Sequence, residues 1–303
     1  MASKPPPHEW WGGLKLLLNT RLSMRFGKYT ALTIMVGFAK SFVLLSTCAV
    51  ANETELKLVW SDEFNYTGLP DSAKWNYDVG GQGWGNQELQ FYTEKRLENA
   101  RVENGSLIIE ARKEPWQGMK FTSARLVTKG KAEWQYGKIA VRATLPRGRG
   151  SWPAVWMLGA TTPLRWPDDG EIDIMEHVGF EPGKIHASIH CKKYYFSVGT
   201  QKTANIMVRD CSNNFHVYAA EWDKDGVKIS VDGNVYFTFK NEHRGYEAWP
   251  FDNKMYLLLN IAVGGSWGGQ QGVDDAIWPQ RMKVDYVRVY APSDKDHAPP
   301  AER

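Results

Sequence analysis

Short runs of alternating apolar and polar residues fill the chain from residue 56 to residue 290, without a sustained helical period. Alternation at period two predicts half-buried β-strands, whereas an amphipathic helix needs apolar residues three and four positions apart. The clearest runs lie at residues 106–112, 138–143, 227–231, 235–239 and 284–290. The pattern therefore predicts a domain made of strands.

Turn signals separate these runs. Asp232-Gly233-Asn234 stands between two of them and indicates a hairpin, while Asn104-Gly105 and Asp225-Gly226 mark further turns. Strands at this spacing, in a chain with 28 glycines, favour an all-β fold, an antiparallel sandwich of jelly-roll type. We expect one such domain over residues 52–291, followed by a polar tail over residues 292–303 and without internal repeats.

Three acids lie close together in one predicted strand, Gly170-Glu171-Ile172-Asp173-Ile174-Met175-Glu176-His177. On a regular strand Glu171 and Asp173 share a face, and the next position on that face is Met175 rather than Glu176. One extra residue, a β-bulge, would turn Glu176 to the side of the other two acids. The segment then directs its Ile and Met side chains to a core and three carboxylates to the opposite surface.

This acid cluster is unfavourable for stability, because like charges raise the pKa values of their neighbours. Two carboxyl groups with different pKa values are what the hydrolysis of a glycosidic bond requires. An acidic strand that simply faces solvent is the alternative interpretation.

The first 51 residues differ from the rest in charge and hydropathy. They hold six Lys or Arg and one acid, an apolar run over residues 29–45 and the small-residue pattern Ala49-Val50-Ala51. These features predict a signal peptide, with residues 1–23 as an over-extended start, and hence a secreted or periplasmic protein. An uncleaved membrane anchor or lipid attachment at Cys48 are the alternatives; Lys40 and the short run argue against a permanent span.

Removing residues 1–51 takes away six positive charges and one negative charge, so the formal net charge falls from +3 to −2. No basic face for nucleic acid is expected after this subtraction. Two cysteines are left, Cys191 and Cys211. An even pair suits a disulfide in an oxidising compartment, although two unpaired cysteines remain an open alternative.

Several of the 14 tryptophans lie in loops rich in glycine or proline, where full burial is hard to arrange. Flat aromatic side chains beside a carboxylate cluster fit a saccharide cleft, because sugar rings present C–H faces to them. The alternative for each is ordinary core packing. The clearest candidates are Trp84, Trp152, Trp166 and Trp267.

Three motifs together carry a resemblance to a known family. They are Gly83-Trp84-Gly85-Asn86-Gln87-Glu88-Leu89-Gln90-Phe91-Tyr92, Trp152-Pro153-Ala154-Val155-Trp156-Met157, and the segment from Glu171 to Glu176. The chain resembles a family 16 glycoside hydrolase, and within that family a laminarinase (endo-1,3-β-glucanase). The resemblance covers nearly all of residues 60–290. It implies a concanavalin-like β-jelly-roll of two curved antiparallel sheets, with the acids on the concave face.

The resemblance also implies roles for the acids. Glu171 would be the nucleophile, Glu176 the general acid and base, and Asp173 the residue that orients and tunes the nucleophile. Carboxyl groups about 5–5.5 Å apart would give retention of the anomeric configuration. The positions implied for sugar binding are Asn86, Trp152, Trp166 and His190, with Arg112 as a weaker candidate. His186 and His190 share a face of an expected neighbouring strand, and either could instead be structural. His177 and Trp156 are expected to be packing residues or to support the site from behind the residues that bind sugar.

The resemblance further implies a structural calcium ion away from the acids, at the positions that match Glu63, Gly105 and Asp285. Calcium takes six to eight oxygens, and backbone ligands leave no trace in a sequence. No cofactor is expected for catalysis, because no His/Cys spacing indicates a catalytic metal.

The implied activity is endo-hydrolysis of 1,3-β-glucan, with mixed-linkage 1,3-1,4-β-glucan as a further substrate. The extra residue in the acid segment accompanies laminarinases in this family, but galactan hydrolases of the agar or carrageenan type share it. The alternatives are therefore a galactanase, a transglycosylase, or a non-catalytic β-glucan-binding protein, although such binders typically lack the two glutamates. We expect a monomer whose partner is a polysaccharide and which makes no stable membrane association after cleavage.

Overall fold

The computed structural model describes residues 56–292, which form strands and two short 3-10 turns, Gly83–Gly85 and Phe196–Val198. In this part of the chain no helix has the length and apolarity needed to cross a membrane. The predictions for residues 1–51, including Cys48, and for the tail after residue 292 lie outside the described residues. Pro292 itself ends the last strand rather than beginning the tail.

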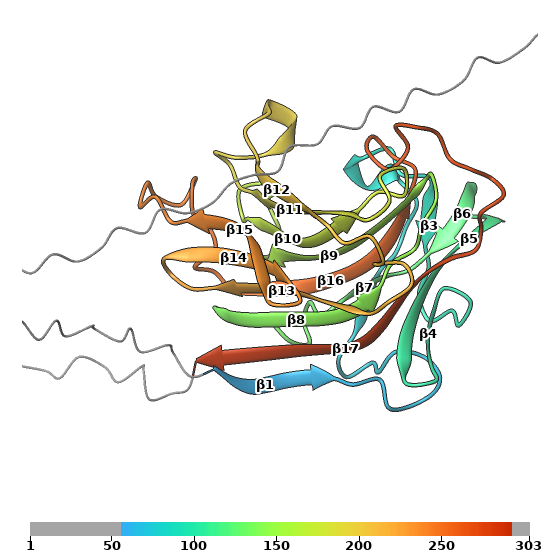
Figure 1. Ribbon diagram of the computed structural model, residues 1–303, viewed down its shortest axis with the longest axis horizontal. Coiled ribbons are helices and arrows are strands. Elements are labelled where there is room, and N and C mark those ends of the chain that lie inside the picture. The colour runs from blue at the N-terminus through green and yellow to red at the C-terminus, as the bar shows by residue number, and fades with distance from the viewer. Residues whose placement is uncertain (1–55, 293–303) are drawn as a thin grey trace, which may run out of the picture. The chain divides into compact units, whose positions relative to one another are not determined.

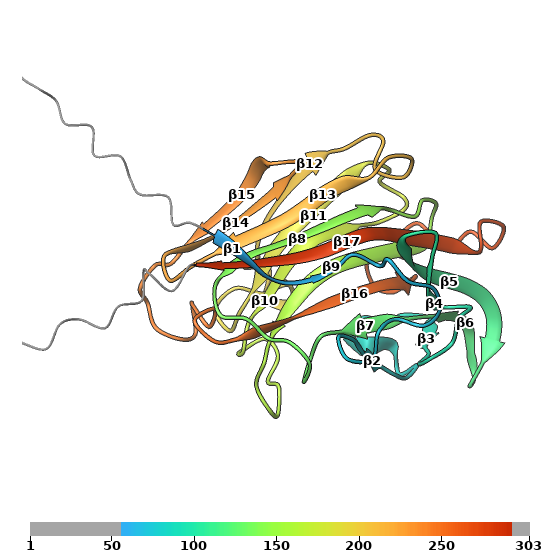
Figure 2. The ribbon, with the colours of Figure 1, turned by 90° about the horizontal axis from the view of Figure 1, so that it is seen from below.

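The strands form two sheets that pack face to face, as Figures 1 and 2 show. The larger sheet has ten strands, and its last pair, β6 and β3, is parallel while the other pairs are antiparallel. Its order is β15 (Asn234–Lys240), β14 (Gly226–Val231), β13 (His216–Trp222), β8 (Gly137–Thr144), β17 (Gln280–Pro292), β5 (Ser106–Trp116), β6 (Met119–Ser123) and β3 (Gln90–Tyr92), with β1 (Leu56–Asp62) beside β17 and β4 (Ala100–Glu103) beside β5.

The smaller sheet has seven strands and carries the three acids in its third strand. Its neighbours are all antiparallel. Its order is β12 (Lys202–Met207), β11 (Lys184–His190), β10 (Glu171–His177), β9 (Ser151–Gly159), β16 (Met255–Val263), β7 (Arg125–Val127) and β2 (Asn76–Asp78).

The alternating runs of the sequence correspond to strands. In β14, Val227, Ile229 and Val231 are buried while the residues between them are more exposed, and β14 pairs with β15 across the predicted hairpin. The all-β prediction is thus confirmed, with the parallel β3–β6 pair as a local exception to an antiparallel fold. Every residue of β16 is buried, and its core residues, Met255, Leu257, Leu259, Ile261 and Val263, alternate with residues on the opposite face.

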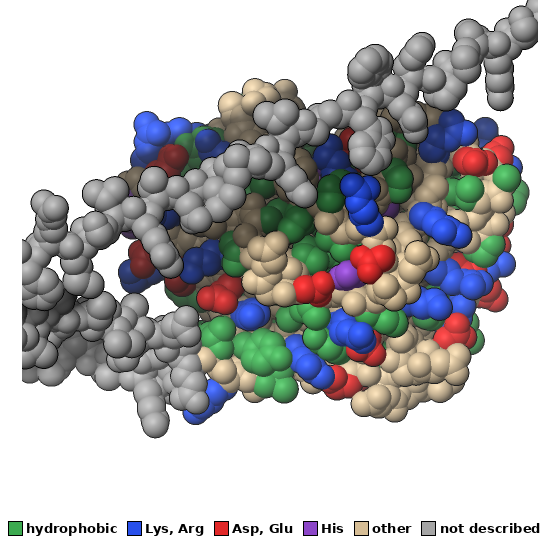
Figure 3. Space-filling view, viewed as in Figure 1, with side chains coloured by type: hydrophobic (Ala, Val, Ile, Leu, Met, Phe, Trp, Pro, Cys, Tyr) green, Lys and Arg blue, Asp and Glu red, His purple; other side chains and the backbone are tan. Residues whose placement is uncertain are grey.

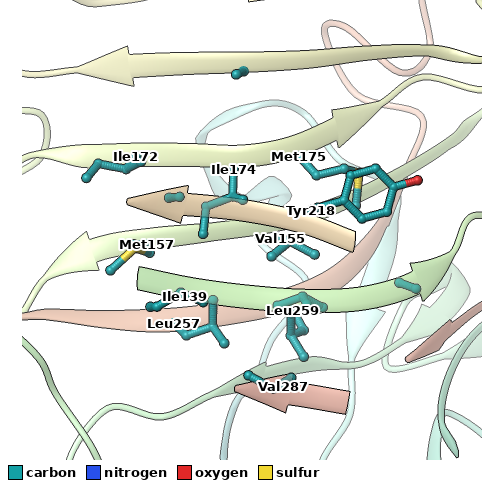
Figure 4. Packing of buried hydrophobic residues seen from close by; sticks show 14 of the residues in the cluster. Ile139, Val155, Met157, Ile172, Ile174, Met175, Tyr218, Leu257, Leu259 and Val287 are labelled. Carbon is teal, nitrogen blue, oxygen red and sulfur yellow. The ribbon is translucent and has the colours of Figure 1, made fainter. Parts of the chain in front are cut away.

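The core lies between the sheets. Figure 4 shows Ile139, Tyr218 and Val287 of the larger sheet packed toward Met157 and Leu259 of the smaller sheet. These side chains are fully buried, and burial of each large apolar side chain stabilises the fold by about 1.5–3 kcal/mol. This packing fixes β9, β10 and β16 as a rigid floor whose other face is free for function. On the face shown in Figure 3, acidic and basic side chains lie side by side.

Candidate active site

A β-bulge interrupts β10 at the predicted place. Asp173 pairs with Trp156 of β9, whereas Met175 pairs with the very next residue, Val155, so that Ile174 is an extra residue. The ladder to β11 shifts over the same segment, between Asp173 and Glu176. The predicted irregularity is confirmed.

The bulge sorts the side chains of β10 onto two faces. Ile172, Ile174 and Met175 are completely buried in the core (Figure 4). Because the successive residues Ile174 and Met175 both point inward, Glu176 faces the same side as Glu171, and Glu171, Asp173 and Glu176 line one cavity. The expected three-carboxylate surface is therefore present.

Glu171 is held by a tryptophan from the preceding loop. The Trp166 Nε1–H donates to Glu171 Oε2 at 2.7 Å, and His190 Nε2 lies 4.0 Å from the other carboxylate oxygen. The loop is fixed by buried Asp169, which accepts hydrogen bonds from the Thr161 hydroxyl at 2.6 Å and the Arg165 backbone N–H at 2.7 Å. These hydrogen bonds hold the loop in place, so the Trp166 indole is kept in position to donate to Glu171.

Glu176 is held in the same way from the opposite end of β10. The Trp152 Nε1–H donates to Glu176 Oε1 at 3.0 Å. Trp152 packs edge to face on Trp267, with ring centroids 5.4 Å apart, and His186 contacts the same Trp267 ring at 5.0 Å. Each glutamate therefore has its own indole donor.

Asp173 lies between the two glutamates and is 2% exposed. His190 Nε2 is 3.1 Å from Asp173 Oδ2 and 4.0 Å from Glu171 Oε1, so the histidine lies beside both carboxylates. Asp173 can thereby hold His190 in place while its own charge acts on both glutamates.

Burial raises the pKa of all three acids, as expected for carboxylates removed from water. Burial and then the charge of Asp173 raise the pKa of Glu171 to about 8, and burial raises the pKa of Asp173 to about 7. Burial and then the charges of Asp173 and Glu171 raise the pKa of Glu176 well above its ordinary value. The nearby His190 and the Trp166 hydrogen bond oppose this rise at Glu171 by lowering its pKa, whereas at Glu176 the charges of both neighbouring acids add to the effect of burial.

We expect Asp173→Asn to raise stability at neutral pH. A carboxyl with a raised pKa in the folded state is deprotonated more easily after unfolding, so its penalty grows from about pH 4, its unfolded pKa, to about pH 7 and then stays constant. Thermal melts should show a gain of up to about 4 kcal/mol at pH 7–8 that vanishes near pH 4.

The matched control for this prediction is Asp275→Asn, because the Asp275 side chain is 69% exposed. It should change the melting temperature little at any of these pH values. A gain for Asp173→Asn that is equally large at pH 4 would contradict the explanation by burial of charge.

The acids lie in a cavity of about 500 Å3 along the outer face of the smaller sheet. Of the residues expected to bind sugar, Asn86, Trp152 and His190 line it, and Trp166 reaches it through Glu171. The loop candidates Trp84 and Trp267 line it as well. Further lining residues that the sequence did not single out include Glu88, Arg125, Ser188, Phe196, Gln201, Thr203 and Asn260.

One half of the cavity is built from a buried polar network. Glu88 Oε2 accepts from Gln90 Nε2 at 2.6 Å and from the Tyr92 hydroxyl at 3.2 Å, and Asn260 Nδ2 donates to that hydroxyl at 3.0 Å. Asn86 Nδ2 donates to Glu88 Oε1 at 3.4 Å. The alternation Glu88, Gln90, Tyr92 was a visible signal for this shared face, but their partner Asn260 lies far away in sequence.

Arg125 lies between two tryptophans in the same half of the cavity. Its guanidinium carbon is 4.8 Å from the Trp84 ring and 4.6 Å from the Trp156 ring, and its Nε is 3.0 Å from Asp78 Oδ2. Trp156 was expected to pack or to support the site from behind, but its position opposite Asp173 on β9 turns it to the cavity, which it lines directly. His177 is fully buried and accepts a hydrogen bond from the Gly183 N–H, as a packing residue would.

Arg112 does not line this cavity, which corrects its assignment as a cleft residue. Leu107, Ile109 and Ala111 of β5 point into the core, so Glu110 and Arg112 point to the outer face of the larger sheet. There the Arg112 guanidinium is bonded to Glu110. The sequence showed that Arg112 lies in a strand, but it did not show which of the two sheets that strand joins.

Cys191 and Cys211 are both buried and free, so the predicted disulfide is wrong. Cys191 follows the end of β11 at His190, whereas Cys211 follows the end of β12 at Met207. These two strands are antiparallel, with Ile189 facing Lys202 and Lys184 facing Met207. The cysteines thus lie at opposite ends of the hairpin, about 15 Å or more apart at about 3.3 Å per residue, and a disulfide needs Cα atoms within about 7 Å.

The carboxylates expected near calcium already have arginine partners. Glu63 pairs with Arg288 through two hydrogen bonds of 2.9 Å, and Arg142 Nη1 donates to Asp285 Oδ2 at 2.6 Å. A guanidinium beside each carboxylate opposes a divalent cation there. Only the Asp285 carboxylate was expected to bind calcium through a side chain, and its arginine partner competes with an ion there. The other expected ligands are backbone oxygens, so the calcium ion at Glu63, Gly105 and Asp285 stays a prediction.

Within residues 56–292, the side chains grouped closely enough to share a metal ion are Glu171, Asp173 and His190, whose ligating atoms lie within 4.8 Å of one another. A cation at this point would occupy the carboxylate that receives the Trp166 hydrogen bond. A bound cation would therefore compete with the use of the Glu171 carboxylate in catalysis.

Comparisons with known proteins agree on one family. Residues 86–288 match the model of the glycosyl hydrolases family 16. A β-glucanase from Rhodothermus marinus is 56% identical over 242 residues, which cover 77% of this chain and 85% of that protein. The crystal structure of the laminarinase from Rhodothermus marinus matches with a TM-score of 0.78 and 54% identity, over 80% of this chain and 99% of that one. SCLam, a non-specific endo-β-1,3(4)-glucanase of known structure, matches with a TM-score of 0.76 and 49% identity, over 78% and 92%.

Proposed function

This chain belongs to glycosyl hydrolase family 16, and on that premise we propose that it is a retaining endo-glucanase that hydrolyses 1,3-β-linked glucan. The observation that carries the proposal is the bulge in β10, which places Glu171 and Glu176 in one cavity with a separate indole donor on each. Cleavage of a glycosidic bond requires two such carboxyl groups, one protonated and one ionised.

The first chemical step uses the two glutamates in opposite protonation states. Glu176, whose pKa is raised by burial and by the neighbouring acids, gives its proton to the glycosidic oxygen. Glu171 attacks the anomeric carbon as a carboxylate and forms a glycosyl ester. The Trp166 N–H and the nearby His190 stabilise the Glu171 charge before the attack.

The second step reverses the proton transfer. The ionised Glu176 takes a proton from a water molecule, the water oxygen bonds to the anomeric carbon, and the ester bond to Glu171 breaks. Asp173 remains between the two glutamates, and its charge favours return of the proton to Glu176. Two displacements at one carbon restore its original configuration.

Substrate preference follows from the relatives and the cavity. The names of the similar proteins speak of β-glucanase, laminarinase and endo-β-1,3(4)-glucanase activity. The cavity offers aromatic rings and polar side chains, which suit sugar rings and their hydroxyls. We therefore assign 1,3-β-glucan as the main substrate and mixed-linkage glucan as a second one.

A substrate panel tests this assignment directly. Laminarin should release reducing ends fastest, lichenan should release them more slowly, and agarose should release none. Reducing-end assays and chromatography of the products would show internal cleavage as a mixture of oligosaccharides. Release from agarose alone would replace the glucanase by a galactanase, and tight binding of laminarin without any release would indicate a non-catalytic β-glucan-binding protein.

Export is a further proposal that rests on residues 1–51 alone. Their positive charges, apolar run and Ala49-Val50-Ala51 pattern favour cleavage after Ala51. N-terminal sequencing of the protein recovered outside the producing cell should begin at Asn52. Recovery of the intact chain in the cytoplasm would contradict it.

A further inference from the structure

The carboxylate of Asp169 is a buried charged group that the proposed chemistry does not use. It lies in the loop between β9 and β10, three residues after Trp166, and its side chain is 0% exposed. Asp169 is not part of the cavity lining. Because a buried charge is unfavourable unless it is well paired, its partners indicate what it does for the loop.

Four hydrogen bonds satisfy this carboxylate. Asp169 Oδ2 accepts from the Thr161 hydroxyl at 2.6 Å and from the Arg165 backbone N–H at 2.7 Å. Asp169 Oδ1 accepts from Arg165 Nη2 at 3.0 Å and from the Tyr246 hydroxyl at 2.9 Å. Burial alone would raise the pKa of Asp169, but these donors outweigh burial and lower it to about 2. The carboxylate therefore stays ionised at neutral and mildly acidic pH.

One of the four donors comes from a segment far away in the sequence. Tyr246 lies between β15 and β16, and its hydroxyl also accepts a hydrogen bond from Asn253 Nδ2 at 2.9 Å. The other three donors belong to the β9–β10 loop itself. Asp169 thus closes this loop on itself and connects it to the segment that leads into β16.

Trp166 depends on this connection because its own ring is poorly enclosed. Trp166 is 41% exposed. Its ring packs on His190, Tyr195 and Phe196, with centroids 6.2, 5.8 and 5.5 Å away, and Phe196 is itself 46% exposed. A hydrogen bond to Glu171 requires the indole N–H to stay within about 3 Å and well aligned. Packing on exposed rings does not impose that geometry, whereas a fixed loop does.

We propose that Asp169 is a positioning residue for the nucleophile: through the β9–β10 loop it holds the Trp166 indole against Glu171, and Tyr246 completes this arrangement from the other segment. This proposal rests on the retaining glucanase function above and assigns control of the nucleophile to a charge outside the cavity. The Trp166 hydrogen bond favours the ionised form of Glu171. Loss of the positioning therefore makes the nucleophile harder to ionise.

Other titratable groups also face Glu171 and act on its ionisation. They are Asp173 and Glu176 of β10, His190 of β11 and Tyr256 of β16. The Asp173 charge raises the pKa of Glu171 and His190 lowers it. None of these groups is altered when Asp169 is replaced, so a change in the ionisation of Glu171 in such a variant reports on the position of Trp166.

The test is the acidic limb of the pH profile of kcat/KM on laminarin, which reports the ionisation of the nucleophile in the free enzyme. Asp169→Asn keeps the size of the side chain but replaces one acceptor oxygen by an amide group that cannot accept. The limb should move to higher pH by about 0.5–1 unit, so kcat/KM on the acidic side should fall about threefold to tenfold. Tyr246→Phe removes a single donor and should move the limb in the same direction by less.

A double variant separates positioning from a general loss of structure. Trp166→Phe removes the indole donor and should shift the limb at least as far as Asp169→Asn does. Adding Asp169→Asn to Trp166→Phe should shift it no further, because both changes act through one hydrogen bond. Asp168→Asn is the matched control: it removes the same charge from the neighbouring residue, which accepts none of the four hydrogen bonds, and should leave the limb in place.

The indole N–H of Trp166 gives a second readout that needs no turnover. Its proton NMR resonance, identified by its absence from Trp166→Phe, should titrate with Glu171 in the unmodified protein. The midpoint of that titration should rise in Asp169→Asn and stay unchanged in Asp168→Asn. An unmodified protein that hydrolyses nothing, but whose resonance behaves in this way, would refute the glucanase function and still support the positioning.

Two results would overturn the proposal. One is an unchanged limb and midpoint in a folded Asp169→Asn protein, which would mean that the neighbouring rings hold Trp166 by themselves. The other is a shift that adds to that of Trp166→Phe, which would mean that Asp169 acts on the site by another route. Thermal melting establishes that each variant is folded, and Tyr246→Phe decides by the same two measurements if Asp169→Asn does not fold.

Discussion

We expect Glu171→Ser to abolish hydrolysis and to leave glucan binding nearly intact. Removing the carboxylate removes the atom that bonds to the anomeric carbon, so kcat on laminarin should fall on the order of 10⁴-fold or more. The cavity keeps its aromatic rings and its polar network around Glu88 and Arg125. Laminari-oligosaccharide affinity measured by calorimetry should therefore stay within about threefold.

Stereochemistry separates this role from a merely structural one. The unmodified enzyme should first release the β-anomer, as proton NMR taken during the first minutes of hydrolysis would show. Glu221→Ser, at an exposed glutamate of β13, is the matched control and should keep full activity. Initial release of the α-anomer, or undiminished turnover by Glu171→Ser, would refute the assignment of Glu171 as nucleophile.

Glu176→Gln should have the second largest effect, and its size should depend on the leaving group. A glucosyl leaving oxygen needs a proton, so kcat/KM on laminarin should fall by about 10²–10⁴-fold. Fluoride leaves without that proton, so kcat/KM on β-laminaribiosyl fluoride should change by less than about tenfold. Without a general base the glycosyl ester on Glu171 is hydrolysed slowly, so fluoride should appear as a burst.

The split between the two substrates is the decisive readout. Trp152 donates to Glu176 at 3.0 Å, and a glutamine can accept that hydrogen bond through its amide oxygen, so the geometry of the site is preserved. Losses of equal size on laminarin and on the fluoride would show that Glu176 supports the site without transferring a proton.

The face on which each acid lies could be predicted from the sequence, because it depends on local alternation. Ile172 and Ile174 alternate with acids, and the count of residues to Glu176 required one irregularity, which the pairing with β9 confirms. The same alternation identified the strand of His186 and His190 beside it. Such features need only the period of a strand and the chemistry of its residues.

The polar half of the cavity could not be predicted in this way. Arg125, Trp84 and Asn260 come together from segments far apart in the sequence, and only the order of strands in the smaller sheet brings them into contact. The disulfide failed for the same reason: the count of cysteines was suitable, but β12 separates them by its whole length. Arg112 carried no signal for the sheet face it would occupy, whereas Trp156 could have been placed on the face of Trp152 by the period of their shared strand.

The bulge at Ile174 also bears on how such a strand can change in evolution. A strand one residue shorter between Asp173 and Glu176 would alternate regularly and would still direct all three acids to the same side. The bulged form and the regular form are thus a single codon deletion apart. That deletion removes one of the two core side chains, Ile174 or Met175, and leaves all three acids in place. An intermediate in evolution would therefore lose packing and stability but would keep its catalytic acids.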